Sequence, residues 1–265
     1  MKKNALWIAL LILIGLWGYN TPGGLLGKAD AVGYAFCHRI DERSFQIDAR
    51  AMPLCARCSG MYLGALLGFA FQAVRANRRG GMPPLRIAAV FVLFVVVFGI
   101  DGVNSYLHLF PGFTGGLYEP NNTLRLLTGT GVGLGIAAVL FPAFNQTVWQ
   151  NAVDLPALPN LRELGLLLGF ALALDALILI ENPLILYPLA LLSVGGLLLI
   201  LSMVYAIVWM MLFRVENSLT HARQLLTPLL GGLLLAMIQV SLLDAGRFLL
   251  TGTWEGFNLA MFNIR

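Results

Sequence analysis

Long apolar runs alternate with short polar stretches along most of the chain. Seven of these runs are rich in Leu, Ile, Val, Ala and Phe, and most approach the roughly 20 residues that an α-helix needs to cross a bilayer. They cover residues 5–19, 54–74, 85–109, 121–141, 161–180, 184–213 and 225–250. The segments 20–53 and 142–160 are too polar or too rich in proline to span and are expected to be loops. We therefore predict an all-α fold, a polytopic transmembrane helix bundle of about seven spans.

The composition supports this class and excludes others. Of the 265 residues, 58% are hydrophobic and only 11% are charged, whereas soluble domains carry about 25% charged residues. The net charge of +4 comes from Lys and Arg residues that flank the apolar runs and form no stripe, so we expect no nucleic-acid partner. The expected surroundings are the lipid bilayer, and the sequence leaves the oligomeric state open.

The first apolar run allows two interpretations. It follows Lys2 and Lys3, as in a signal peptide, and Ala29-Asp30-Ala31 has the small-x-small form of a cleavage site. That site lies about ten residues beyond the run, however, whereas a cleavage site normally follows the apolar region closely. We favour an uncleaved first span, which makes residues 1–32 an N-terminal membrane anchor.

The orientation follows from the Lys and Arg residues in the short loops, because cytoplasmic loops carry an excess of them. Placing Lys2 and Lys3 in the cytoplasm also places several other basic residues there: Arg75, Arg78, Arg79, Arg86, Arg162, Arg214 and Arg223. The segment 20–53 is the exception, with four basic residues balanced by four acids. We predict a cytoplasmic N-terminus and an extracytoplasmic loop between the first two spans.

Polar residues inside the spans are not scattered. Charged side chains within a membrane usually face the interior of the bundle. At 1.5 Å per residue, Asp101 lies about 22 Å beyond Arg86, near the outer end of the third span, and Asn104 follows on the same face. Asn122 and Arg125 begin the fourth span at the same level. The fifth and seventh spans add further groups there, namely Asp175, Glu181, Gln239, Asp244 and Arg247.

We expect four of these residues to line a polar pocket in the outer leaflet, where a polar or anionic headgroup of a lipid or a quinone would bind. They are Asp101, Asn104, Asn122 and Arg125. The opposite charges of Asp101 and Arg125 suggest a pair, either functional or a structural staple. As the deepest charges of this group they are the candidate catalytic residues, and whether the protein is an enzyme stays open.

A glycine series occurs in the fourth span. It consists of Gly129, Gly131, Gly133 and Gly135, which make two overlapping G-x-x-x-G spacings. Close packing against a neighbouring helix explains this series, because small residues let two backbones approach.

The richest chemistry lies in the loop before the second span. All three cysteines of the chain fall there, Cys37, Cys55 and Cys58, with His38 beside the first. Cys55 and Cys58 form a C-x-x-C pair at the start of a predicted helix, where the N-terminal amides stabilise a thiolate. We take these four residues as the candidate metal ligands, with Zn as the default ion for sulfur and nitrogen donors.

Four alternatives stay open. Adjacent side chains such as Cys37 and His38 diverge in regular structure, so one alternative has only one of them as a ligand, with Asp101 or water in the remaining position. The C-x-x-C pair could instead cycle between dithiol and disulfide, coupled to a quinone, with Cys37 as a shuttle. The cysteines could also be a structural disulfide with one spare thiol. Finally, the outward-facing acids could serve a transporter as an entry for cations or protons.

At these residues the chain resembles a family of predicted prokaryotic membrane proteins catalogued as domain of unknown function 2085. The matching pieces are Cys37-His38, Arg43-Ser44-Phe45, Pro53-Leu54-Cys55-Ala56-Arg57-Cys58, Gly60, Tyr62-Leu63-Gly64, Asp101-Gly102, Asn122, Arg125 and Gly129. The likeness covers roughly residues 33–141. It implies that the cysteine loop and the polar residues of the third and fourth spans form one unit, in a prokaryotic cell (inner) membrane. We therefore divide the chain into the anchor, this core at 33–141, and a three-span extension at 142–265.

Overall fold

The structure, a computed structural model, describes residues 3–110, 112–113 and 115–256, so Lys2 and the last part of the predicted extension lie outside the described residues. The described chain is mostly helical, as predicted, with eight α-helices. Each of the seven apolar runs coincides with one of them: α1 (Lys3–Asn20), α3 (Ala56–Arg75), α4 (Leu85–Leu107), α5 (Asn122–Val148), α6 (Leu161–Leu179), α7 (Pro183–Leu212) and α8 (Leu226–Thr251).

Length and apolar composition qualify some of these helices as membrane spans. Among the described residues four pass on both counts, namely α4, α5, α7 and the segment Ala222–Thr251 that contains α8. The pair of α1 and α2 (Gly24–Phe36), bent by 99°, makes a fifth if it is one span. α6 carries three charged residues, Arg162, Glu163 and Asp175. The membrane character is therefore supported, while the count of seven spans and the cytoplasmic N-terminus stay predictions.

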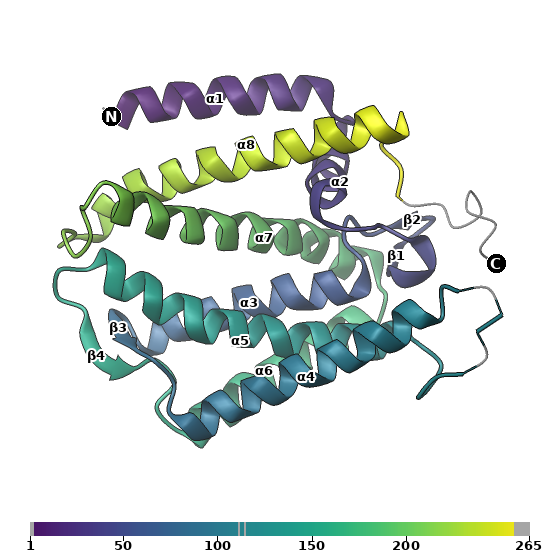
Figure 1. Cartoon of the computed structure of the whole chain (residues 1–265), viewed down its shortest axis with the longest axis horizontal. Helices are drawn as coiled ribbons and strands as arrows, with labels where there is room; N and C mark the ends of the chain where they lie inside the picture. The colour runs from purple at the N-terminus through teal and green to yellow at the C-terminus, as the bar shows by residue number, and fades with distance from the viewer. Residues whose placement is uncertain (1–2, 111, 114, 257–265) are drawn as a thin grey trace.

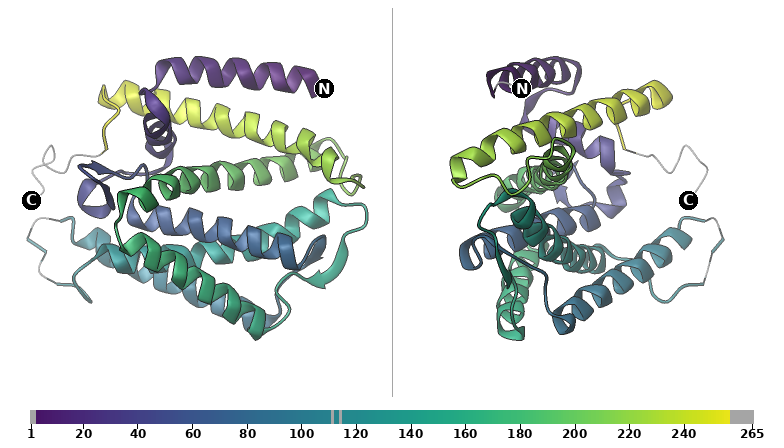
Figure 2. Two further views of the ribbon diagram at one scale, coloured as in Figure 1. Left: turned by 180° about the vertical axis from the view of Figure 1, so that it is seen from behind. Right: turned by 60° about the vertical axis from the view of Figure 1, so that its left-hand side comes forward.

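The long helices lie side by side in an elongated bundle (Figure 1). α1 packs on α8, α8 on α7, and α7 on the central pair of α3 and α5, with α4 and α6 along the remaining side. The chain reverses direction between successive long helices, so that α3, α5 and α7 begin at the end where α4, α6 and α8 finish (Figure 2). We call this the α2 end, because α2 lies there, and the opposite one the β3 end.

Four short strands join the helices at the two ends. At the α2 end, β1 (Gln46–Ile47) and β2 (Arg50–Ala51) form a hairpin. At the β3 end, β3 (Arg79–Gly81) pairs in parallel with β4 (Val153–Pro156). The predicted loop at 142–160 thus contains a strand.

The central contact between α3 and α5 depends on glycine. A Cβ atom at Gly133 would lie 2.0 Å from the Met61 carbonyl oxygen, and one at Gly129 would lie 2.1 Å from that of Arg57. The helix packing predicted from the glycine series of α5 is therefore confirmed at these two positions. The facing helix has a matching series, Gly60, Gly64 and Gly68, whose added Cβ atoms would each lie within 2.7 Å of α5. In the sequence, Gly60 and Gly64 were visible only as family motif residues without a packing role. Backbones this close favour dispersion and weak hydrogen bonding between helices in a membrane.

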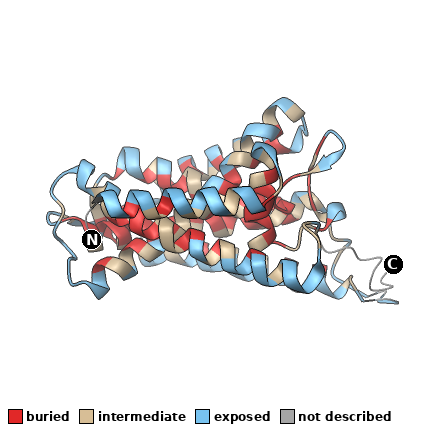
Figure 3. Cartoon of the chain, turned by 90° about the horizontal axis from the view of Figure 1, so that it is seen from above, coloured by how far each residue is buried: buried red, intermediate tan, exposed pale blue. Residues whose placement is uncertain are grey.

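Apolar side chains also cover the outside of the bundle. Figure 3 shows buried residues along the interior and exposed ones on the outer helix faces. On α4 the exposed side chains include Val92, Leu93, Val95 and Val96, and on α1 they include Leu11, Ile12 and Leu16. Such faces match the hydrocarbon of a bilayer, where backbone groups are satisfied within each helix.

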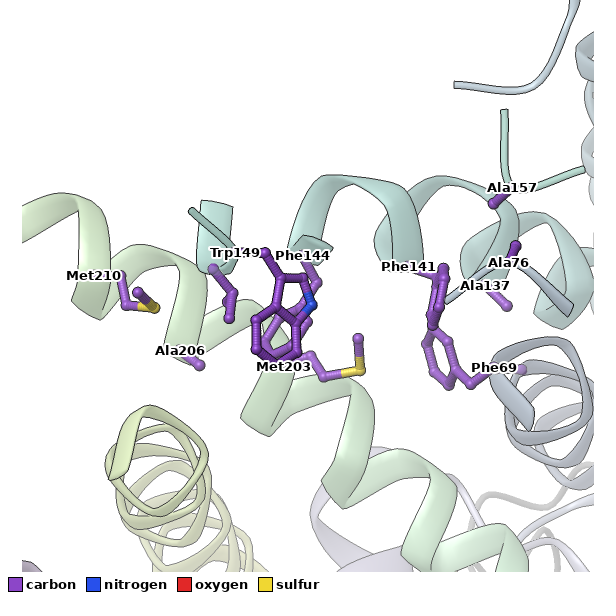
Figure 4. Close-up of a cluster of buried hydrophobic side chains, with 12 residues drawn as sticks. Phe69, Ala76, Ala137, Phe141, Phe144, Trp149, Ala157, Met203, Ala206 and Met210 are labelled. Carbon is purple, nitrogen blue, oxygen red and sulfur yellow. The ribbon is translucent and has the colours of Figure 1, made fainter. Parts of the chain in front are cut away.

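A buried cluster at the β3 end explains where α5 finishes. α5 continues through Pro142 to Val148, so the loop expected from Pro142 begins later than predicted. Phe141 and Phe144 pack there with Trp149 and Met203 (Figure 4). Proline in a helix interior removes one hydrogen bond, and packing on both sides of Pro142 outweighs that loss.

Candidate metal centre

The three cysteines meet at the α2 end. Cys37 is the C-terminal cap of α2, Cys55 is the N-terminal cap of α3, and Cys58 lies in the first turn of α3. All three are free thiols, and their sulfur atoms lie within 4.8 Å of one another. In a tetrahedral site with Zn–S bonds of about 2.3 Å, the sulfur atoms are about 3.8 Å apart. The observed separation is thus within reach of a single ion.

A close approach of two chain segments brings Cys37 to the other two cysteines. The polar stretch before α3 predicts a loop, but residues 24–36 form the helix α2. A Cβ atom at Gly33 would lie 2.1 Å from the carbonyl oxygen of Pro53, so only glycine lets α2 pack against the segment that leads into α3. Lys28 supports the bend before α2, because its ammonium donates to Gly18 O and, at 2.9 Å, to Thr21 O at the end of α1.

The local electrostatics favour a thiolate at Cys37. Its sulfur accepts a hydrogen bond of 3.3 Å from the backbone N–H of Cys55. Hydrogen bonds with the Cys55 thiol and then the Cys58 thiol lower the pKa of Cys37 well below its ordinary value, although burial opposes this. Cys37 and Cys55 are only 5% and 3% exposed, whereas Cys58 is half-buried. The cluster therefore approaches the surface at Cys58.

His38 follows Cys37 in the chain, but the group of ligand atoms that lie within 4.8 Å of one another consists of the three cysteine sulfurs and does not include His38. Its Nδ1 accepts a hydrogen bond of 3.0 Å from the backbone N–H of Ile40, so a metal bond would fall to Nε2. Burial lowers the pKa of His38, the Cys37 charge raises it, and nearby arginines lower it further. A neutral imidazole is the form that binds metals. His38 thus stays a predicted fourth ligand.

Asp101 has a different partner from the one predicted. The structure pairs its carboxylate with Arg57, which stands between Cys55 and Cys58, and not with Arg125. Asp101 also accepts a hydrogen bond of 2.8 Å from the hydroxyl of Tyr118. The first turn of α3 directs Arg57 at α4, where its guanidinium meets Asp101 and Ser105. A carboxylate that is 1% exposed is therefore linked to the cysteine motif itself.

The other predicted pocket residues also lie at the α2 end, where they hold the loops. Asn104 donates to Tyr118 O at 2.9 Å and accepts from Leu117 N at 3.0 Å. Asn122 accepts a hydrogen bond of 2.8 Å from Arg125 and donates at 3.3 Å to the Glu42 carbonyl. Arg43 and Arg57 were visible in the sequence only as motif residues without a role, and no sequence signal pointed to Tyr118.

Two of the remaining acids have partners within the bundle. Asp175 accepts a hydrogen bond of 2.7 Å from Thr130, and Asp244 accepts one of 2.8 Å from the indole of Trp17. Arg247 donates to the carbonyl of Cys37 at 2.8 Å and so ties α8 to the cysteine loop. These contacts favour a structural role for the acids over a transport path.

Comparisons with known proteins match the same part of the chain. The family described as "Predicted membrane protein (DUF2085)" matches residues 37–139. An uncharacterized protein of Methanothermobacter thermautotrophicus is 33% identical over 107 residues, which are 39% of this chain and 82% of that protein. The uncharacterized protein MJ1492 of Methanocaldococcus jannaschii is 28% identical over 121 residues, 46% of this chain and 71% of that protein. No solved structure matches the chain.

Proposed function

This chain belongs to the DUF2085 family of predicted membrane proteins, and from that premise we propose that it is a membrane protein whose cysteine cluster binds a transition metal ion. The observation that carries the proposal is the position of the three sulfur atoms. They come from the end of one helix and the start of another, and they lie within 4.8 Å of one another. The metal would join the two segments at the α2 end of the bundle.

Zinc is the ion that best suits this donor set. Three thiolates make a soft site, and Zn prefers tetrahedral coordination by sulfur and nitrogen. His38 would supply the fourth ligand through Nε2, or a water would occupy that position. An open position would favour a catalytic role, because catalytic Zn sites keep one exchangeable ligand.

We further propose that this end of the bundle faces the outside of a prokaryotic cell membrane. The basic residues of the loops support this orientation. Arg75 is the last residue of α3, Arg78 and Arg79 follow it, and Arg214 follows the end of α7, all at the β3 end. The positive-inside rule then puts the β3 end in the cytoplasm.

Elemental analysis of the detergent-purified protein tests the proposed metal. We expect about one Zn per chain in the wild type and a loss of most of it in Cys55→Ser and Cys58→Ser. Wild-type metal content in both variants would contradict the proposal. His38→Gln should weaken Zn retention against a chelator, and His108→Gln is its matched control. His108 also lies at the α2 end, where its Nδ1 pairs with the carbonyl of Asn104 at 2.8 Å.

A second candidate function, thiol–disulfide exchange, is favoured by the fact that all three cysteines are free and close together. In this reaction two thiols would form a disulfide and pass two electrons and two protons to an acceptor of the quinone class. Alkylation with a maleimide discriminates between the two functions. A redox pair gains labelling after a reductant, whereas a metal site gains labelling after a chelator.

A further inference from the structure

Three guanidinium groups gather beside the cysteine cluster from three separate elements. Arg43 ends the short turn Asp41–Arg43, Arg57 lies in α3, and Arg125 lies in the first turn of α5. Arg43 and Arg57 meet at one residue of α4, since Arg43 donates to Ser105 O at 2.9 Å and Arg57 to Ser105 Oγ at 3.3 Å.

Arg125 reaches the same place through Asn122. The side chain of Asn122 accepts from Arg125 and donates to the carbonyl of Glu42, the residue next to Arg43. The three arginines therefore share one small region.

This region holds more positive than negative charge. Asp101 is the carboxylate in ion-pair contact there, and its partner is Arg57. Within the described part of the chain, neither Arg43 nor Arg125 has a carboxylate within 4.0 Å. Arg125 is only 6% exposed. Among the described residues, the one hydrogen-bond partner of its guanidinium is the neutral side-chain amide of Asn122, and its Nε has none. Burying a cation is costly unless an anion compensates it.

We propose that Arg43, Arg57 and Arg125 form a binding site for a phosphate group. Guanidinium groups bind phosphate through paired N–H···O bonds, and donors converging from several directions suit a tetrahedral oxyanion. The N-terminus of α5 adds a favourable dipole, since Arg125 lies only about 4.5 Å along the helix axis from Asn122.

The three arginines differ in their exposure to solvent. Arg43 is half-buried, like the neighbouring His38, and the side chain of Arg57 is 20% exposed. Arg125 is buried. The phosphate group would belong either to free phosphate or to the headgroup of an anionic phospholipid, because the ends of the membrane helices lie at headgroup level.

This site goes beyond the proposed metal site and does not rest on it. Its three arginines are not metal ligands. A divalent ion bound by three thiolates would carry one net negative charge, which is too little to offset both unpaired guanidinium groups. Phosphate binding is therefore expected with or without the metal.

Titration of the detergent-purified full chain with inorganic phosphate, followed by calorimetry, tests the free-ligand source. We expect saturable binding that weakens at least tenfold in Arg125→Gln and in the less buried Arg43→Gln. Arg86→Gln is the control, because Arg86 is exposed at the β3 end of α4, and it should bind like the wild type.

Lipid nanodiscs test the headgroup source. We expect native mass spectrometry to show retention of phosphatidylglycerol over phosphatidylcholine by the wild type, and loss of this preference in the same two variants. Saturable binding of inorganic phosphate, or a preference for phosphatidylglycerol, supports the site if both variants lose it. Wild-type affinity in both variants, or neither saturable phosphate binding nor preference for the anionic lipid, would overturn it. Elemental analysis of the same samples separates this result from that for the metal.

Discussion

Replacing Asp101 with leucine tests whether the cysteine motif and α4 are coupled through a buried charge. Asp101 is 1% exposed and pairs with Arg57, whose side chain is 20% exposed. The variant Asp101→Leu keeps the number and branching of the side-chain heavy atoms but leaves the guanidinium of Arg57 without its counter-charge. It also removes the acceptor of the Tyr118 hydroxyl.

The expected cost follows from the burial of the pair. Removing one partner of a buried ion pair costs about 3–5 kcal/mol, because the other charge stays buried and uncompensated. Arg57 keeps some access to solvent, so we expect Asp101→Leu to lower the free energy of unfolding by about 2–4 kcal/mol. The second change, Arg57→Leu, removes the uncompensated charge, so the double variant should be more stable than Asp101→Leu alone.

Unfolding in mixed detergent micelles, followed by circular dichroism, measures this cost. Glu163→Gln is the control, since its partner Arg75 is exposed and the pair lies at the β3 end. We expect Glu163→Gln to change the free energy of unfolding only slightly. The reasoning is refuted if Asp101→Leu unfolds like the wild type, or if Arg57→Leu adds a further loss of the same size.

Three other changes test the rest of the fold. Gly133→Ala places a Cβ atom 2.0 Å from the Met61 carbonyl, so it should cost about 1–3 kcal/mol of stability in thermal melting. Gly99→Ala is the control, because a Cβ atom there meets nothing within 4 Å, and it should melt like the wild type. Equal melting temperatures for Gly133→Ala and Gly99→Ala would contradict the α3–α5 contact. Lys28→Met leaves carbonyl groups at the end of α1 unsatisfied and should lower the free energy of unfolding by about 1–3 kcal/mol, again measured by thermal melting. An unchanged melting temperature would contradict the role of Lys28 in supporting the bend before α2. In a background with all three cysteines replaced by serine, an impermeant maleimide should label Glu119→Cys on intact cells but Asp154→Cys only after lysis, and the reverse pattern would invert the predicted orientation.

The apolar periodicity was sufficient to predict the long helices, because each depends mainly on its own residues. The boundaries were less predictable where tertiary packing competes with local preference. Pro142 ended the predicted fourth span, yet packing of Phe141 and Phe144 carries α5 to Val148. The helix α2 was missed because its charged residues, Lys28 and Asp30, suggested a loop. In the structure Lys28 caps α1 and Asp30 pairs with Arg39 at 3.0 Å.

The motif was sufficient to predict that the three cysteines lie close together, because all of them flank the start of one predicted helix. The partner of Asp101 was not visible in the same way. Opposite charges on Asp101 and Arg125 suggested a pair, but the choice between Arg57 and Arg125 depends on how α3 is rotated against α4. That rotation is determined by the glycine contacts between α3 and α5, which bring backbone atoms of Arg57 against Gly129. The convergence of Arg43 with the other two arginines likewise needs the folded loop.

X-ray absorption at the Zn edge of the purified full chain is the most direct test of the metal centre. It reports both the element and its ligands. We predict three sulfur neighbours at about 2.3 Å and one nitrogen or oxygen neighbour at about 2.0–2.1 Å. A protein that holds no Zn after purification and reconstitution, or whose Zn has only nitrogen and oxygen neighbours, would contradict the assignment of Cys37, Cys55 and Cys58 as ligands.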